Sequence, residues 1–416
     1  METIVAEAPQ AIGDTGISRP LLEELALKVL FLHGEMSLAD LAARVCLSLP
    51  VVDELFQSFR REQLCEVKGM VRGTHFISAS AAGKERAAAS FAFDHYAGAA
   101  PVSLGDYTAR VRARSLQAAT VGPEDLERAL EKMVLEDDLF RRLGTAIVSG
   151  KSVFLYGPAG TGKTTLACSI PAIYEDFVLI PHALEVGGQI IAVFDPGVHQ
   201  IVRGPIPDDW DRRWVLCRRP RVMAGGELSS EMLDLQFHTN GRFLTAPLQL
   251  KANNGVLVLD DFGRQRMRPE ELLNRWMTPL DRRVDFLTLP GGKKFEVPFD
   301  VLVVFSTNID PRTLADEAFL RRIPNKIHMN YATPRQFAEI FQRECARRML
   351  LCEHDLAQYA VEFITNEMKQ PLSHCYAGDI VNQICWSAKY LGVEPRMTRR
   401  AFQRACQSYF VPVASI

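Results

Sequence analysis

The nine residues from 157 to 165 constrain the fold of this chain more than any other part of its sequence. After a short apolar run at 153–156, and before an apolar segment, they read Gly157-Pro158-Ala159-Gly160-Thr161-Gly162-Lys163-Thr164-Thr165. This is the pattern G-x-x-x-x-G-K-[ST] between a strand and a helix, in which glycines let backbone N–H groups turn toward phosphate oxygens. Lys163 is predicted to contact the β- and γ-phosphates, and Thr164 to offer its hydroxyl to Mg²⁺. A glycine-rich turn without a ligand would need neither residue, so a nucleotide-phosphate site is the stronger interpretation.

A second apolar run, at 255–259, ends in two carboxylates, Asp260 and Asp261. A continuous apolar run is typical of a strand buried on both faces, and ligands bind at the carboxyl ends of such strands. Asp260 is therefore predicted to hold Mg²⁺ through water, and Asp261 to orient and polarise an attacking water. The alternative for both residues is a structural pair that caps the next segment.

The composition indicates a soluble globular protein of two or three domains. The chain has 416 residues, 47% of them apolar and 24% charged, and its formal net charge is −2. That balance argues against a protein that coats nucleic acid or an anionic membrane. The nine cysteines are scattered and form no C-x-x-C pair, which is typical of a reducing compartment. The N-terminus lacks a basic signal segment and no apolar run approaches the ~18 residues that span a bilayer, so a cytoplasmic protein is expected.

Changes of pattern along the chain divide it into five stretches. Residues 1–17 show no periodicity and are expected to be a disordered tail. Residues 18–92 form a small domain, and 93–121 is a linker with one short helix. Strands and helices alternate from 122 to 332, which is typical of an α/β domain. The last stretch, 333–416, is wholly helical.

Residues 18–92 show three amphipathic helices and then two short β runs, a pattern that resembles the winged-helix family. The stretch holds nine Lys/Arg and nine Asp/Glu residues. Asp53 and Glu54 begin the third helix, where a recognition helix would meet phosphates. Because phosphate neutralisation needs a surplus of positive charge, the balance favours a domain that docks on protein.

The two motifs, a third strand at 301–307 followed by Asn308, and the helical end of the chain together resemble the AAA+ ATPases over about residues 122–410. The resemblance implies a P-loop α/β core with an all-α lid, and ATP and Mg²⁺ as cofactors. It implies that Asn308 contacts the γ-phosphate or the attacking water. It also implies that Arg321 and Arg322, jointly, supply an arginine finger that reaches the nucleotide of a neighbouring subunit.

Two positions depart from that family. Most relatives carry Glu at the position of Asp261, which is one methylene shorter. Many relatives also place an Arg at the start of the third lid helix, where this chain has Tyr376-Ala377-Gly378-Asp379-Ile380. The coupling of the lid to the nucleotide is therefore in question, whereas nucleotide binding is not.

Residues 284–297 predict a β-hairpin around Pro290-Gly291-Gly292. It resembles the hairpin that precedes the third motif strand in MoxR-type chaperones, magnesium chelatases and enhancer-binding regulators. The segment 225–250 is either a partner-contacting insertion of that subgroup or an ordinary surface loop. A further hairpin is expected at 180–195, with Gly187-Gly188 at its turn.

The resulting hypothesis is an ATP-hydrolysing AAA+ motor that assembles into a homo-oligomeric ring, in this family most often a hexamer, and remodels a protein partner. One alternative is a nucleic-acid-associated AAA+ ATPase of the helicase-loader, transposition-helper or transcription-regulator type. A salt-bridged surface is the stronger interpretation of the arginines that could support it, which are Arg264, Arg266, Arg268, Arg275, Arg282 and Arg283. The other alternative is a nucleotide-gated scaffold in which Asp261 supports only weak hydrolysis.

Overall fold

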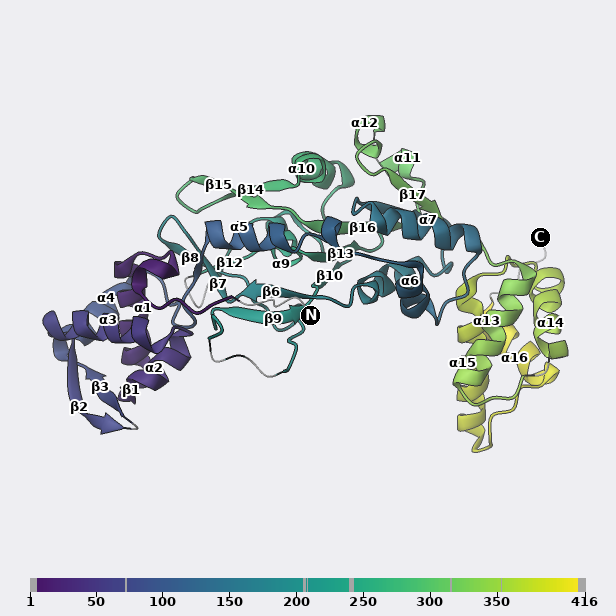
Figure 1. The fold of residues 1–416 in the computed structure, drawn as a ribbon. Coiled ribbons are helices and arrows are strands. Elements are labelled where there is room, and N and C mark those ends of the chain that lie inside the picture. Colours follow the sequence, from purple (N-terminus) through teal and green to yellow (C-terminus); the bar gives the residue numbers. More distant parts are fainter. Residues whose placement is uncertain are drawn as a thin grey trace.

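The described part of the chain forms three bodies in a row (Figure 1). A computed structural model describes residues 6–71, 73–204, 207, 209–238, 243–314, 316–352 and 354–410. A small N-terminal domain lies at one end, an α/β core in the middle and a helical domain at the other end. Within these ranges, no helix combines the length and the apolar character that a bilayer crossing requires.

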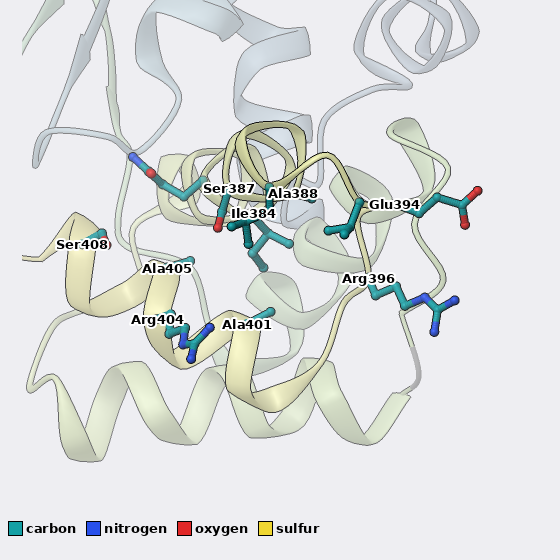
Figure 2. A pocket seen from close by; sticks show the side chains of 12 residues that line it. Ile384, Ser387, Ala388, Glu394, Arg396, Ala401, Arg404, Ala405 and Ser408 are labelled. Carbon is teal, nitrogen blue, oxygen red and sulfur yellow. The ribbon is translucent and has the colours of Figure 1, made fainter.

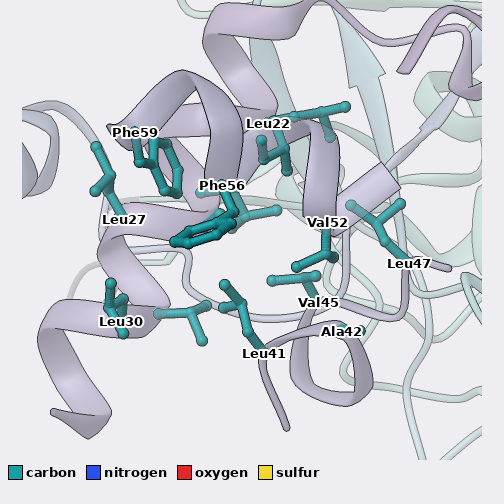
Figure 3. Close-up of a cluster of buried hydrophobic side chains, with 14 of the residues drawn as sticks. Leu22, Leu27, Leu30, Leu41, Ala42, Val45, Leu47, Val52, Phe56 and Phe59 are labelled. Carbon is teal, nitrogen blue, oxygen red and sulfur yellow. The ribbon is translucent and has the colours of Figure 1, made fainter. Parts of the chain in front are cut away.

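The N-terminal domain packs its helices against a three-stranded antiparallel sheet in the order β1-β3-β2. Its elements are α1 (Arg19–His33), β1 (Met36–Ser37), α2 (Leu38–Val45), α3 (Leu49–Arg61), β2 (Cys65–Val71), β3 (Thr74–Ala79) and α4 (Ala81–Phe93). The apolar residues of these helices are spaced so that they face inward, and Leu22, Phe56 and Phe59 lie in one buried core (Figure 3). Three helices and a hairpin thus occur where the sequence predicts them, and the winged-helix assignment stays a prediction.

Residues 6–17 pack against the protein, which corrects the expectation of a disordered tail for this part. Ala6, Ile12 and Ile17 are buried, and Ile12–Thr15 form a short 3₁₀ helix, η1. The Ala8 N–H donates to the Asp209 carbonyl at 2.7 Å, in a segment about 200 positions away. Contacts of this kind produce no periodic pattern of apolar residues in the sequence, because they are made with distant segments of the chain. Residues 1–5 lie outside the described ranges.

A buried ion pair joins these N-terminal residues to the core. The side chains of Arg213 and Asp211 are only 5% and 4% exposed, and Arg213 donates to Asp211 from Nη2 at 2.8 Å and from Nε at 3.0 Å. Arg213 Nη1 also donates to the carbonyls of Thr15 at 2.8 Å and Pro101 at 3.3 Å. One guanidinium therefore holds three separate segments together.

Replacing Arg213 is expected to destabilise the protein strongly. An Arg213→Ala change leaves the Asp211 carboxylate buried without its cation, which costs about 3–5 kcal/mol for a pair of this kind. The matched control is Arg268→Ala, because Arg268 is 77% exposed and its ion pair is with the neighbouring Glu271, so it should cost at most ~1 kcal/mol. Chemical denaturation followed by circular dichroism measures both. Equal midpoints for the two variants would contradict this role of Arg213.

The core is a five-stranded parallel sheet in the order β10-β13-β16-β5-β17. Its strands are β10 (Arg221–Ala224), β13 (Gly255–Leu259), β16 (Val301–Thr307), β5 (Val153–Tyr156) and β17 (Asn325–His328). Successive side chains point to opposite faces, so each strand contributes to both apolar layers. Helices α6 (Pro123–Leu130), α7 (Asp137–Val148) and α8 (Lys163–Ser169) cover one face, and α10 (Pro269–Arg282) covers the other. With a glycine-rich loop joining β5 to α8, this is the α/β fold of P-loop NTPases.

A second sheet, in the order β11-β12-β8-β7-β4, lies beside the core. Its strands are β4 (Val102–Ser103), β7 (Ala183–Val186), β8 (Gln189–Ala192), β11 (Gln236–His238) and β12 (Phe243–Thr245). The hairpin around Gly187 and Gly188 is confirmed, and both glycines have positive φ. Segment 225–250 supplies the short strands β11 and β12 to this sheet, while residues 239–242 lie outside the described ranges. The expected linker holds α5 (Leu104–Ala113) and also β4, which pairs with β7.

Two antiparallel strand pairs complete the α/β region. β6 (Phe177–Pro181) pairs with β9 (Trp214–Arg218). β14 (Val284–Thr288) pairs with β15 (Lys294–Pro298), which confirms the hairpin predicted at 284–297. The apolar side chains of this hairpin join the core of the second sheet.

The C-terminal domain is helical, as the sequence predicts. It contains α13 (Pro334–Arg347), α14 (His354–Glu362), the π-helical turn η5 (Phe363–Glu367), α15 (His374–Leu391) and α16 (Arg399–Tyr409). Thr333 caps α13 by accepting from the Gln336 N–H, while Pro334 occupies the first helical position. Phe337, Phe341 and Phe402 form the centre of its apolar core.

Candidate functional site

The glycine-rich loop forms a cradle that positions Lys163. Gly157, Gly160 and Gly162 have φ of 136°, 74° and 86°, a region that side chains disfavour. The Lys163 ammonium donates to the carbonyls of Gly157 at 2.9 Å and Pro158 at 2.6 Å. Burial lowers the pKa of Lys163, while the charges of Asp260 and Asp261 oppose that shift. The Thr161 hydroxyl is a third neutral partner at 3.4 Å, and a buried cation held by neutral groups is suited to receive an anionic group.

Thr164 and Asp260 lie against each other at the start of α8 and the end of β13. The Thr164 hydroxyl is 2.9 Å and 3.0 Å from the two carboxylate oxygens of Asp260. Both groups are hard oxygen ligands, and Mg²⁺ usually combines one or two such groups with water and substrate phosphates. The donor set present at this point therefore fits Mg²⁺.

One cavity of about 360 Å³ brings the predicted phosphate and catalytic residues together. It is lined by Gly160, Thr161, Gly162, Lys163, Thr164 and Thr165, together with Asp261, Ser306 and Asn308. Asp261 and Asn308 follow neighbouring parallel strands, β13 and β16, so the sheet sets both at the same edge. The loop after Asp261 is fixed, because the Phe262 N–H donates to Ser306 O at 2.7 Å and Thr307 Oγ1 donates to Phe262 O at 2.6 Å.

Arg321 and Arg322 lie outside this cavity. Arg321 is 75% exposed and pairs with Glu317 at 2.7 Å. Arg322 donates to the Ala318 carbonyl at 2.7 Å and lies 3.5 Å from Asp281. Both line a separate, smaller hollow of about 190 Å³. Neither arginine therefore reaches the phosphate loop of its own chain.

The helical domain contacts the phosphate loop through residues that the sequence does not point to. The Cys375 N–H donates to the Gly160 carbonyl at 3.1 Å, and Ser373 Oγ donates to the Ala159 carbonyl at 3.3 Å. A Cβ on Gly160 would come within 2.3 Å of Ser373 Oγ, so only glycine allows this approach. His374 also lines the cavity, its buried Nδ1 has no hydrogen-bond partner within the described ranges, and burial lowers its pKa. The contact thus begins one to three residues before the stretch Tyr376–Ile380 that the sequence singles out.

The remaining wall of the cavity is mostly apolar. It consists of Lys132, Met133, Val134 and Leu135, between α6 and α7, and of Ile340 from α13. The sequence signal for this wall is only a three-residue apolar run next to a lysine, which many surface turns share. The wall fits the flat apolar face of a nucleobase, opposite a polar end that fits phosphates.

Known proteins resemble this chain only in part. Residues 333–408 match a family model described as a domain of unknown function, DUF8689, which covers the helical domain alone. No curated protein shows significant similarity to the chain. Among solved structures, RuvB of Thermotoga maritima, titled a Holliday junction branch migration motor, matches at 15% identity and a TM-score of 0.38, over 69% of this chain and 70% of RuvB. A mutant form of that RuvB matches at 16% identity and a TM-score of 0.39, over 72% of this chain and 73% of its own.

These TM-scores are low. The fold assignment therefore depends on the parallel sheet order and on the loop between β5 and α8, both described above.

Proposed function

We propose that this protein is an AAA+ ATPase that binds ATP with Mg²⁺ and hydrolyses it to ADP and phosphate. The observation that carries the proposal is the single cavity that joins Lys163, Thr164, Asp261 and Asn308, with Asp260 directly behind Thr164. Each of these residues supplies a different part of phosphoryl-transfer chemistry. A purely structural role would not explain why all of them gather at one edge of the sheet.

Each residue has a distinct role in this proposal. Lys163 binds the β- and γ-phosphates, and Thr164 and Asp260 hold Mg²⁺, which neutralises charge on the phosphates when bound. Asp261 orients the attacking water and accepts its proton, while Asn308 donates to a γ-phosphate oxygen or to that water. Water adds to the γ-phosphorus, and the bond to the bridging oxygen of ADP breaks.

The position of the two arginines supports assembly into a ring. Arg321 and Arg322 are remote from the cavity of their own chain, so an arginine finger would act on the nucleotide of a neighbouring copy. A closed ring, in this proposal a hexamer, gives every copy the same pair of contacts. Nucleotide bound between copies would then stabilise the ring.

Subunit mixing tests the trans arrangement directly. Lys163→Ala and the double change Arg321→Ala with Arg322→Ala are each expected to be inactive as ATPases. Mixed together they should regain turnover, because some interfaces then combine an intact loop with intact arginines. A double variant that hydrolyses ATP like the wild type would rule these arginines out as fingers. The control is Arg268→Ala, an exposed arginine that should leave turnover unchanged.

The charge distribution favours a protein as the partner that is remodelled. Glu54 on α3 accepts from the Ile12 N–H at 3.0 Å and pairs with Arg19. Of the arginines that could serve nucleic acid, Arg275 pairs with Asp285 at 2.5 Å and Arg283 lies 3.5 Å from Asp300. These cations are neutralised within the chain. The β14–β15 hairpin supports kinship with the MoxR-like subgroup, and the N-terminal domain is proposed as a winged-helix adaptor.

A further inference from the structure

One cavity in the helical domain has no part in the proposed ATPase reaction. It is a groove of about 610 Å³ between α15 and α16 in the helical domain (Figure 2). Its lining residues lie beyond the lid residues that meet the phosphate loop, since the groove begins at Gln383 and the loop contact ends at Cys375.

The floor of the groove is apolar and shallow-sided. Ile384 and Ala388 come from α15, and Ala401 and Ala405 come from α16, each pair spaced by four residues (Figure 2). Residues four apart lie on one face of a helix, so two facing stripes of mostly small side chains leave an open channel. A channel between two helices with such a floor accepts the apolar face of a third helix.

The apolar surface continues beyond the channel. Leu391 and Val393, which line its end, are 62% and 58% exposed, and the neighbouring Trp386 and Tyr390 are 58% and 89% exposed. Exposed apolar residues gathered in this way mark interaction sites more often than scattered ones do.

The segment that forms the groove carries an excess of positive charge in a chain of net charge −2. Residues 383–408 contain five basic residues, Lys389, Arg396, Arg399, Arg400 and Arg404, and a single acidic one, Glu394. The charged residues that line the groove itself are Arg396, Arg404 and Glu394, so cations outnumber anions two to one there, and neither arginine forms an ion pair with a residue of the described ranges. The occupant must therefore be negatively charged where it meets the walls and apolar where it meets the floor.

We propose that this groove binds an acidic amphipathic helix of a partner protein. The apolar floor decides against nucleic acid, because a phosphate backbone gains nothing from alanine and isoleucine side chains. This inference goes beyond the ATPase function and does not depend on it, since no groove residue lines the nucleotide cavity.

The test uses the full chain without nucleotide and a labelled 18-residue model peptide. The peptide carries Leu at helical i, i+3, i+4, i+7 spacing with Glu and Ala elsewhere, and a matched peptide carries Lys in place of Glu. Fluorescence anisotropy should show saturable binding of the Glu peptide and much weaker binding of the Lys peptide. Arg404→Glu should weaken the Glu peptide at least about tenfold, and Ser387→Trp, which fills the groove from an exposed position, should abolish binding.

Two matched variants control for general effects. Gln407→Trp adds the same side chain at an exposed position of α16 that does not line the groove, and Arg335→Glu reverses an exposed charge on α13. Both should bind the Glu peptide like the wild type, with unchanged circular dichroism. Equal binding of both peptides, or a Ser387→Trp variant that still binds, would overturn the proposal. Two other results would also overturn it. One is a single-stranded DNA that displaces the peptide and binds Arg404→Glu more weakly than the wild type. The other is a self-association of the protein that Ser387→Trp abolishes. The Lys163→Ala variant should bind the peptide normally. A failure of the ATPase proposal can therefore be distinguished from a failure of this one.

Discussion

A Lys163→Ala variant is expected to lose nucleotide binding, with the affinity for ATP falling by at least ~100-fold. Lys163 is the only cation in the phosphate loop, and the loop already holds its ammonium beside the cavity. Hydrogen bonds to charged groups contribute roughly 1.5–3 kcal/mol each, and two of them to phosphate oxygens account for a change of this size. Titration with a fluorescent ATP analogue measures the affinity.

Thermal denaturation provides an independent readout of the same change. ATP with Mg²⁺ should raise the melting temperature of the wild type by mass action and leave that of Lys163→Ala unmoved. Lys151→Ala, which removes an exposed lysine just before β5, should respond to ATP like the wild type. A Lys163→Ala protein with wild-type affinity would show that the ligand of this cavity is not a nucleotide phosphate.

The polar end of the site could be predicted from the sequence because of the way parallel strands are built. The runs 153–156, 255–259 and 301–305 are each continuously apolar, and each is followed within a few positions by residues that carry chemistry. Once three such strands are parallel neighbours, their carboxyl ends meet at one edge. The sequence therefore predicts that Lys163, Asp261 and Asn308 lie close together, although it does not give the distances between them.

The apolar wall and the lid contact could not be predicted in the same way. Ser373 and Cys375 act through hydrogen bonds to the Ala159 and Gly160 carbonyls, which any residue with a hydroxyl or a backbone N–H could form. The packing of residues 6–17 depends on Arg213, some 200 positions away, and on single apolar residues without a period. Such contacts depend on the tertiary arrangement, and local propensity does not report them.

The groove between α15 and α16 shows a third limit of the sequence. Ile384 and Ala388 are four residues apart on α15, a spacing that is typical of core positions in a helix. Ala388 and Ala405 are buried and Ala401 is half-buried, yet all three line the groove. Spacing alone does not distinguish a filled interface from an unfilled one.

An Asp261→Asn variant is expected to bind ATP with unchanged affinity and to hydrolyse it at least ~100-fold more slowly, the contribution typical of a positioned general base. The side chain is exposed to the cavity, and its φ of 49° lies in the left-handed region. Asn tolerates that region as well as Asp does, so the substitution removes the charge and leaves the backbone in place. The hydrogen bonds from the Phe262 N–H and to the Phe262 carbonyl also remain, since neither uses the Asp261 side chain.

Single-turnover phosphate release measures the chemical step of this variant, and the nucleotide titration measures binding. Asp355→Asn, an exposed change on α14, should behave like the wild type in both. Asp261→Glu keeps the carboxylate and adds the methylene found in most AAA+ relatives, so it should retain turnover far above that of Asp261→Asn. If Asp261→Asn hydrolyses ATP at the wild-type rate, the catalytic base lies elsewhere. If the wild type is equally slow and only Asp261→Glu is faster, the shorter side chain itself limits hydrolysis, and ATP acts in this protein mainly by staying bound.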